Sequence, residues 1–175
     1  MWIFVKFVLI LMVFILATFI GYALARRYKT RVAEINDMIF ALYIFETKIK
    51  YTYDSLTTSF LYIADRMKTK VYRLFYITAE QLKENKNISA GDCFKQVVDD
   101  EKIFLALNKD DIEIIKGLGV CLGQVDMDGQ VKTIKLVSDS LKKQLTEATE
   151  DNRKNFKLYR NMGVLSGLII MIILL

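Results

Sequence analysis

The 175-residue sequence contains no histidine and no proline. Histidine is the commonest general base and metal ligand, so its absence excludes Ser-His-Asp and Cys-His catalysis and histidine-rich zinc sites. Proline is the commonest interruption of a helix, so its absence favours long helices. An enzyme built from this chain would depend on carboxylates, and no carboxylate pair stands out as one that a pocket could activate. We therefore predict a protein that is not an enzyme and needs no cofactor.

Two further features are scarce or missing. The two cysteines, Cys93 and Cys121, have no CxxC spacing and no neighbouring ligands, which indicates ordinary buried thiols and no metal site. No GxxxxGK[ST] motif occurs, so the chain does not bind nucleotide through a P-loop.

The net charge of +5 comes from two short runs near the ends of the chain. Between Val32 and Asn152 there are 16 Lys and Arg residues against 20 Asp and Glu residues, so this central part is acidic. The basic and aromatic run Lys70 to Tyr76 could suit nucleic acid or anionic lipid, but it is more typical of a helix with one buried stripe and one solvated face. We predict no nucleic-acid partner.

A 19-residue stretch without charge, Phe7 to Ala25, is long enough to cross most of a ~30 Å hydrocarbon core. A basic cluster follows it at Arg26, Arg27, Lys29 and Arg31, and the positive-inside rule then places the rest of the chain in the cytoplasm. The alternative is a secretory signal peptide cleaved after Ala23-Leu24-Ala25, which would leave the domain outside the cytoplasm. The two arginines directly after that bond argue against cleavage.

The C-terminal end repeats this pattern in reverse. Four basic residues, Arg153, Lys154, Lys157 and Arg160, precede an uncharged apolar run over residues 162–175. A helix of this length covers about 21 Å, which is short of a full span unless it starts within the interface. A core helix of a soluble protein is the alternative. Gly163 and Gly167 form a GxxxG pair that would let two membrane helices approach closely.

Between these ends the pattern predicts about six helices. Apolar residues at steps of three and four from Val32 to Ile49, and again from Val131 to Ala148, indicate two long amphipathic helices that pack antiparallel and continue into the two terminal segments. Shorter helices are predicted over 56–67, 70–84, 90–100 and 109–123. Their expected N-caps are Asp54 or Ser55 for the first, Ser89 for the third and Asn108 for the fourth.

The segment from Gln124 to Gly129 partly resembles a calcium-binding loop. Its first position is a glutamine and its twelfth is Lys135, where a bidentate glutamate is needed, so we interpret it as a turn in which Asp126 or Asp128 caps the last helix. Small residues at such a corner would let a partner approach closely. The tentative partner-binding residues are therefore Leu118, Gly119, Gly123 and Asp126, with the alternative that the glycines only serve the turn.

The C-terminal half carries a recognisable pattern: Leu118-Gly119, Leu122-Gly123, Asp126, Gln130 and Ile134, then Lys157 to Arg160 and Gly163 to Leu168. With Asn87 to Ala90 and Phe45 to Tyr51, this pattern resembles the stage III sporulation protein AB family of endospore-forming bacteria over essentially the whole chain. The family usually has a Pro-Leu pair and Glu-Ala near residues 51–60, where this chain has Ser55-Leu56 and Thr57-Thr58. That departure leaves any partner contact in this stretch open.

The resemblance implies a protein similar to the inner-membrane platform subunit of type II secretion and type IV pilus machines. It implies a place in the mother-cell membrane around the forespore, other sporulation channel proteins and a secretion-type ATPase as partners, and a homo-oligomer as one possibility. Our prediction is an all-α protein with a transmembrane helix at 1–25, a cytoplasmic bundle at 26–161 and a membrane segment at 162–175. The alternative function is a membrane-anchored sensor whose long helices transmit movement to a cytoplasmic partner.

Overall fold

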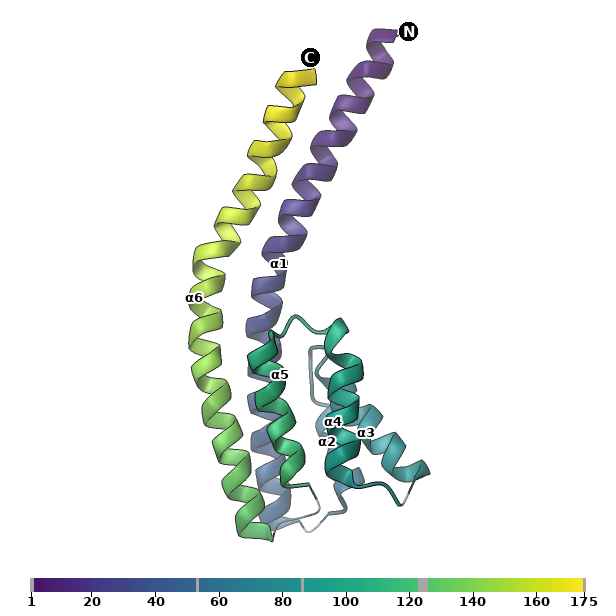
Figure 1. The fold of residues 1–175 in the computed structure, drawn as a ribbon, viewed down its shortest axis with the longest axis vertical. Helices are drawn as coiled ribbons and strands as arrows, with labels where there is room; N and C mark the ends of the chain where they lie inside the picture. Colours follow the sequence, from purple (N-terminus) through teal and green to yellow (C-terminus); the bar gives the residue numbers. More distant parts are fainter. Residues whose placement is uncertain (1, 53, 86, 123–125, 175) are drawn as a thin grey trace. The chain divides into compact units, whose positions relative to one another are not determined.

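The computed structural model describes residues 2–52, 54–85, 87–122 and 126–174, with backbone alone for residues 2–10, 173 and 174. These residues form six α-helices and two 3-10 turns (Figure 1). The helices are α1 (Trp2–Tyr51), α2 (Leu56–Ala64), α3 (Tyr72–Glu84), α4 (Ala90–Glu101), α5 (Lys109–Lys116) and α6 (Met127–Leu174); the 3-10 turns are η1 (Lys102–Phe104) and η2 (Gly117–Val120). The all-α class and the expected number of helices are confirmed.

The chain divides into two compact units. One unit, which we call the helical domain, is Arg31–Glu147; the other, which we call the arms, combines Met1–Thr30 with Ala148–Leu175. These bounds differ from the predicted limits of the membrane segments because the arms pack on each other beyond their apolar runs. Tyr28 stacks on Tyr159 there, with ring centroids 5.7 Å apart.

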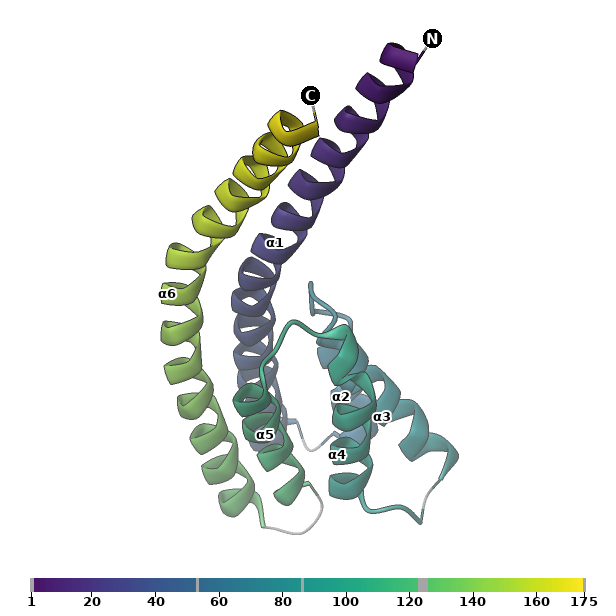
Figure 2. The same cartoon turned by 45° about the horizontal axis from the view of Figure 1, so that its top comes forward.

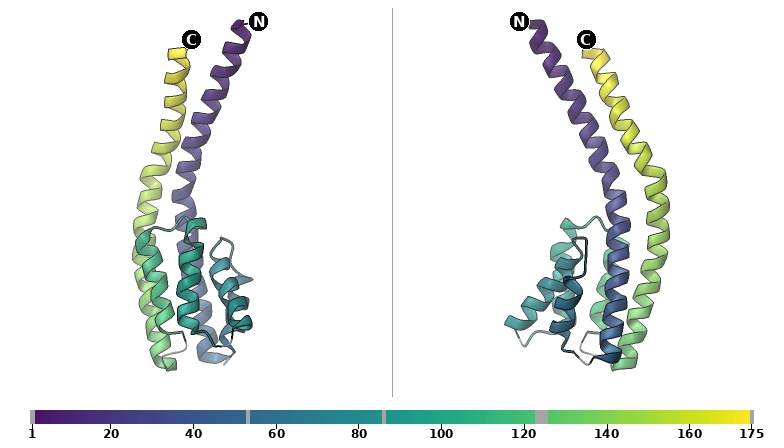
Figure 3. Two further views of the ribbon diagram at one scale, coloured as in Figure 1. Left: turned by 45° about the vertical axis from the view of Figure 1, so that its right-hand side comes forward. Right: turned by 180° about the vertical axis from the view of Figure 1, so that it is seen from behind.

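In the helical domain, α1 and α6 run antiparallel (Figure 3). Arg31 donates to Gln144 at 2.9 Å, and Lys135 lies 3.9 Å from Glu46, so residue numbers rise along one helix as they fall along the other. The predicted apolar positions Ile35 and Leu42 of α1, and Ile134 and others of α6, are buried as a helix with one apolar face requires.

Four phenylalanines, one from each of the first four helices, form the centre of the domain. Phe60 lies 5.4 Å from Phe45, 5.3 Å from Phe75 and 6.1 Å from Phe94, measured between ring centroids. The first two pairs meet edge to face, the arrangement that aromatic quadrupoles favour. This cluster holds α2, α3 and α4 against α1.

Helix starts follow the predicted caps, with one exception at Ser89. The Ser55 hydroxyl accepts the Thr58 N–H, Asn108 and Asp111 form a capping box, and Asp126 accepts the Gly129 N–H at 2.7 Å. Ser89 occupies the N-cap of α4 as predicted, but its side chain makes no capping hydrogen bond. The predicted helix over 109–123 ends early, at Lys116, because the chain tightens into the 3-10 turn η2.

Two carboxylates of α1 attach loops to the end of the helical domain at which α1 enters it. Glu34, which is almost fully buried, accepts the Ala106 N–H at 2.6 Å. Asp37 accepts the N–H groups of Lys68 and Thr69 at 2.9 and 2.6 Å. We call this end, formed by the α2–α3 loop, η1 and the loop before α5, the Arg31 end (Figure 2).

Candidate functional site

The corner predicted to bind a partner is largely interior. Leu118 is fully buried, and Gly119 packs on Gly91 of α4 so closely that a Cβ atom at Gly119 would lie 2.8 Å from the Gly91 carbonyl oxygen. These two residues therefore serve the internal packing of the domain and offer no side chain to a partner. At Gly119 the geometry supports the alternative interpretation, in which the glycine serves the fold.

The other two residues of the predicted set differ from this pair. Gly123 lies outside the described residues. Asp126 is exposed, and its carboxylate caps α6 through Gly129. Val120 of η2, which is 53% exposed, is an accessible apolar side chain of this corner.

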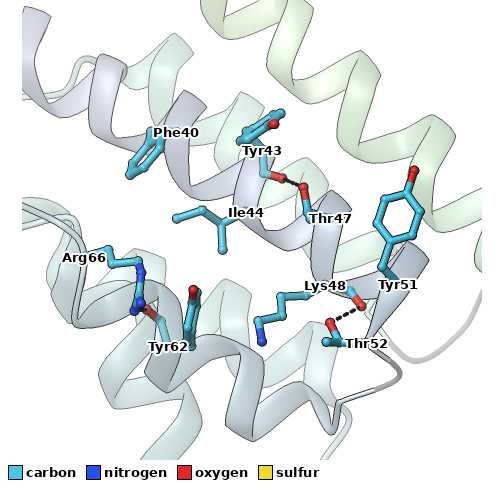
Figure 4. Close-up of a pocket in the computed structure, with 9 residues that line it drawn as sticks. All are labelled: Phe40, Tyr43, Ile44, Thr47, Lys48, Tyr51, Thr52, Tyr62 and Arg66. Atoms are coloured by element: carbon cyan, nitrogen blue, oxygen red, sulfur yellow. Dashed lines mark hydrogen bonds between the residues drawn. The ribbon is translucent and has the colours of Figure 1, made fainter.

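A more developed surface lies between α1 and α2. Here a groove of about 450 Å³ is lined by aromatic and basic side chains, and its members are Phe40, Tyr43, Ile44, Thr47, Lys48, Tyr51, Thr52, Tyr62 and Arg66 (Figure 4). We call it the aromatic groove. Phe40 is 48% exposed, Tyr43 67% and Tyr51 76%. Exposed aromatic side chains that gather on one face are typical of protein–protein contacts.

Two cations flank the ring of Tyr62 in this groove. The Arg66 guanidinium lies 3.4 Å from the ring centroid and the Lys48 ammonium 4.2 Å from it. Lys48 is also bound to Asp54 at 2.7 Å. These contacts hold Tyr62 in one orientation, because cation–π attraction and packing oppose rotation of the ring. A partner would therefore meet a largely preformed surface.

This groove was not predicted from the sequence. The buried face of α1 was predicted from residues such as Ile35 and Leu42, whereas Phe40 and Tyr43 are exposed and lie outside that stripe. In the sequence, Phe40 and Tyr43 could have been recognised as aromatic residues beside the stripe of buried apolar residues. The sequence alone could not show whether another helix covers it.

The predicted basic flanks separate into two groups. Arg26, Arg27 and Lys29 are exposed, and so are Arg153, Lys154, Lys157 and Arg160, as residues at a membrane surface would be. Arg31 is only 8% exposed. Its guanidinium binds the buried carboxylate of Asp111 at 2.8 and 3.1 Å, so it is part of the domain interior.

The glycines of the C-terminal segment lie against α1. A Cβ atom at Gly163 would be 2.8 Å from Cα of Gly21, and one at Gly167 would be 2.8 Å from the ring of Phe14. The two arms thus approach each other through small residues. In this structure, the GxxxG pair therefore packs against α1 of the same chain.

In the described part of the chain, the two cysteines are not activated thiols. Burial raises the pKa of the Cys93 thiol and raises that of Cys121 to about 11, so both are protonated at neutral pH. Among the described residues, no three His, Cys, Asp or Glu side chains gather as a metal site would require.

One helix in the part of the chain with described side chains is long and apolar enough to cross a membrane. It is the stretch Leu11–Tyr51 of α1, with a mean hydropathy of 1.4 in its most apolar window. Only 11% of that window is buried. A membrane segment near the N-terminus is therefore compatible with this helix by length and composition.

Comparisons with known proteins agree on one family. The family model of stage III sporulation protein AB matches residues 6–175. Stage III sporulation protein AB of Bacillus subtilis (strain 168) is 30% identical over 158 residues, which cover 90% of this chain and 92% of the relative. A solved structure of a stage III sporulation protein AB superposes with a TM-score of 0.66 at 28% identity, covering 70% of this chain and 96% of the other. None of these names gives an enzymatic activity.

Proposed function

Because the chain belongs to the stage III sporulation protein AB family, we propose that it is a non-enzymatic scaffold of a sporulation channel, anchored in the membrane by both arms and docking a secretion-type ATPase. This proposal rests mainly on the preformed aromatic groove of the helical domain. The first helix of that domain, α1, also contains the apolar segment that could cross a membrane. A scaffold needs a surface on which its partner docks, and it needs no catalytically activated side chain.

Both arms support membrane anchoring. Large apolar side chains are exposed on the N-terminal arm, among them Ile15, Phe19 and Ile20, and on the C-terminal arm, among them Leu165 and Ile169. Each of these five is more than half exposed. A contiguous apolar surface of this kind is unfavourable in water and is stable in lipid. Exposed basic residues follow one apolar run and precede the other, which favours a cytoplasmic helical domain.

The aromatic groove supports docking of a protein partner. Tyr43 and Phe40 offer apolar area, while Lys48 and Arg66 offer charge at its edge. Aromatic and arginine side chains are enriched among the few residues that carry most of the binding energy in typical interfaces. We assign the secretion-type ATPase to this groove, other channel proteins to the remaining surface, and the mother-cell membrane around the forespore as the location.

Site-specific photo-crosslinking in sporulating cells tests this assignment. A benzophenone amino acid replaces Tyr43 in one strain and Leu136 in another; these residues are similarly exposed, at 67% and 69%, and lie on α1 and α6 respectively. We expect an adduct with the ATPase subunit from position 43 and none from position 136. Equal adducts from both positions would show proximity without a docking site.

A variant provides the functional readout. Tyr43→Asp places a charge in the groove without touching the core, so we expect fewer spores while the helical circular dichroism of the purified chain is unchanged. Leu136→Asp is the matched control and should sporulate normally. Normal sporulation of Tyr43→Asp would remove the groove from the proposal.

A further inference from the structure

The aromatic groove has the length and the walls of a site for a helix. Its α1 side runs from Phe40 to Tyr51, a distance of about 16 Å, or about three helical turns, at 1.5 Å per residue. Its other side is α2, which contributes Tyr62 and Arg66 (Figure 4). Both walls are helices, and the described residues form no strand, so an extended segment has no sheet edge to join there. A groove of this kind fits an amphipathic helix whose apolar residues recur at steps of three and four.

The charge of the groove indicates what such a helix must carry. Among the described residues that line the groove there are two cations, Lys48 and Arg66, and no carboxylate. Lys48 is already paired with Asp54 at 2.7 Å, and only 18% of its side chain is exposed. The acid beside Arg66 is Asp65, whose carboxylate lies 3.6 Å away and is 85% exposed, so water screens the attraction between them. Arg66 is therefore the cation of the groove with which a partner's carboxylate would pair.

The Arg66 guanidinium is held in place before any partner binds. It stacks on the Tyr62 ring, and its Nη1 donates to the Tyr62 carbonyl oxygen at 3.2 Å. Within the described parts of the chain, its Nε and Nη2 atoms make no hydrogen bond. A planar guanidinium has N–H groups in a fixed fork that binds a carboxylate through two parallel hydrogen bonds.

The backbone that follows Arg66 is fixed as well. Asp37 of α1 accepts the N–H groups of Lys68 and Thr69, which ties the chain just after α2 to α1 at the Arg31 end. Because both the side chain and the backbone are positioned beforehand, a carboxylate that pairs with Arg66 costs little conformational entropy.

We infer that the aromatic groove takes an amphipathic helix of about three turns from its protein partner, with an Asp or Glu side chain of that helix bound to Arg66. The apolar residues of the same helix cover Phe40, Tyr43 and Tyr51, which are 48%, 67% and 76% exposed. The inference rests on the proposed docking of the ATPase in this groove and names the chemistry of the segment that docks.

Photo-crosslinking from position 43 of the full-length chain in sporulating cells tests the role of Arg66. Arg66→Glu reverses a charge of the groove, and Lys70→Glu makes the same change at an exposed residue that does not line it. We expect Arg66→Glu to lower the yield of the ATPase adduct about tenfold, because repulsion replaces charge-assisted hydrogen bonds. Lys70→Glu should leave the yield unchanged. Circular dichroism of both purified variants checks that they are folded.

A charge exchange tests the pair itself. Mass spectrometry of the digested adduct identifies the segment of the ATPase that contacts position 43. We expect apolar residues at steps of three and four in this segment, with Asp or Glu on the same helix face. Replacing that carboxylate by lysine should lower the adduct yield with the unmodified chain and restore it with Arg66→Glu. Such a restoration would not occur if Arg66→Glu acted by disturbing the fold.

The outcomes separate this inference from the docking on which it rests. Absence of an ATPase adduct from position 43 of the unmodified chain would overturn the docking and the inference together. An ATPase adduct that Arg66→Glu does not reduce, or that Lys70→Glu reduces equally, would overturn the inference alone. So would a crosslinked segment that is rich in proline and has no helical spacing of apolar residues. An adduct with a second copy of this chain in place of the ATPase would contradict both.

Discussion

Arg31 shows how one residue can carry two conflicting signals. In the sequence it is the last of four positive charges after an apolar segment, which indicates a topology signal. In the structure its guanidinium forms two hydrogen bonds with Asp111, which is fully buried and also completes the capping box of α5. Removing one partner of such a pair leaves an uncompensated buried charge and typically costs about 3–5 kcal/mol. Arg31 therefore contributes to the stability of the domain.

Glycines 117 and 119 provide a residue-scale prediction. A Cβ atom at Gly119 would lie 2.8 Å from the Gly91 carbonyl oxygen, whereas one at Gly117 would meet only the Val137 side chain at 3.7 Å. We expect Gly119→Ala to destabilise the domain by about 1–3 kcal/mol through overpacking and Gly119→Arg to destabilise it at least as much. Gly117→Ala should be neutral or slightly stabilising. Urea unfolding followed by circular dichroism measures these changes.

The two glycine variants also decide between two views of the corner. If Gly119 bound a partner, Gly119→Arg would keep the fold and lose sporulation. The contact with Gly91 predicts that the free energy of unfolding falls together with sporulation. A Gly119→Arg protein as stable as the unmodified chain would contradict the packing argument.

At the scale of elements, α1 and α6 each serve two environments. In the helical domain they bury one stripe, which includes Ile35 and Ile134, and keep polar faces in water. In the apolar runs of the arms most outward-facing side chains are apolar, and small residues such as Gly21 and Gly163 face the other arm. This reversal is what a change from water to lipid requires, because lipid provides no hydrophobic force between helices and close packing takes its place.

The contact between the arms gives the element-scale prediction. An isobutyl group at position 163 would overlap Gly21, so Gly163→Leu should push the arms apart. Spin labels at Leu16 and Leu168, both exposed, report the distance between the arms in vesicles by pulsed electron resonance. We expect a longer and broader distance distribution for Gly163→Leu. Val164→Leu, at a partly exposed neighbouring position, should match the unmodified chain, and identical distributions in both variants would count against the glycine contact.

For the whole molecule, the testable feature is the side of the membrane on which the domain lies. Thr149→Cys lies two residues beyond the end of the helical domain and is introduced in a chain whose two native cysteines are replaced. It should resist a membrane-impermeant thiol reagent added to intact cells. The native thiols are poor targets in any case, because burial raises the pKa of Cys121 to about 11 and keeps it protonated. Labelling as rapid as that of an external control would place the domain outside the cytoplasm.

Local features of the fold were readable without a structure. Helix caps at Ser55 and Asn108 follow from side chains that satisfy the free N–H groups of their own first turn, so a few adjacent residues contain the whole signal. The two long helices follow from the spacing of apolar residues and the absence of proline. The end of α5 was misjudged because a 3-10 turn and an α-helical turn have similar sequences.

The candidate site could not be predicted in the same way. Phe40 and Tyr43 have the composition of core residues, and only the path of α2 leaves them uncovered beside Tyr62. Lys68 and Ile103 are 35 positions apart in the sequence. They share the Arg31 end because Asp37 and Glu34, one turn apart on α1, attach their two loops.

The sequence by itself determined the helical class, the positions of the apolar runs, the basic flanks beside them and the family. Each of these depends on composition or on spacing within one segment. The tertiary structure decided which residues of those segments are accessible: it buried Arg31 and Gly119 and left Tyr43 and Ile103 exposed. The physical reason is that burial depends on which distant segment packs against a residue, and that pairing is fixed by the fold as a whole.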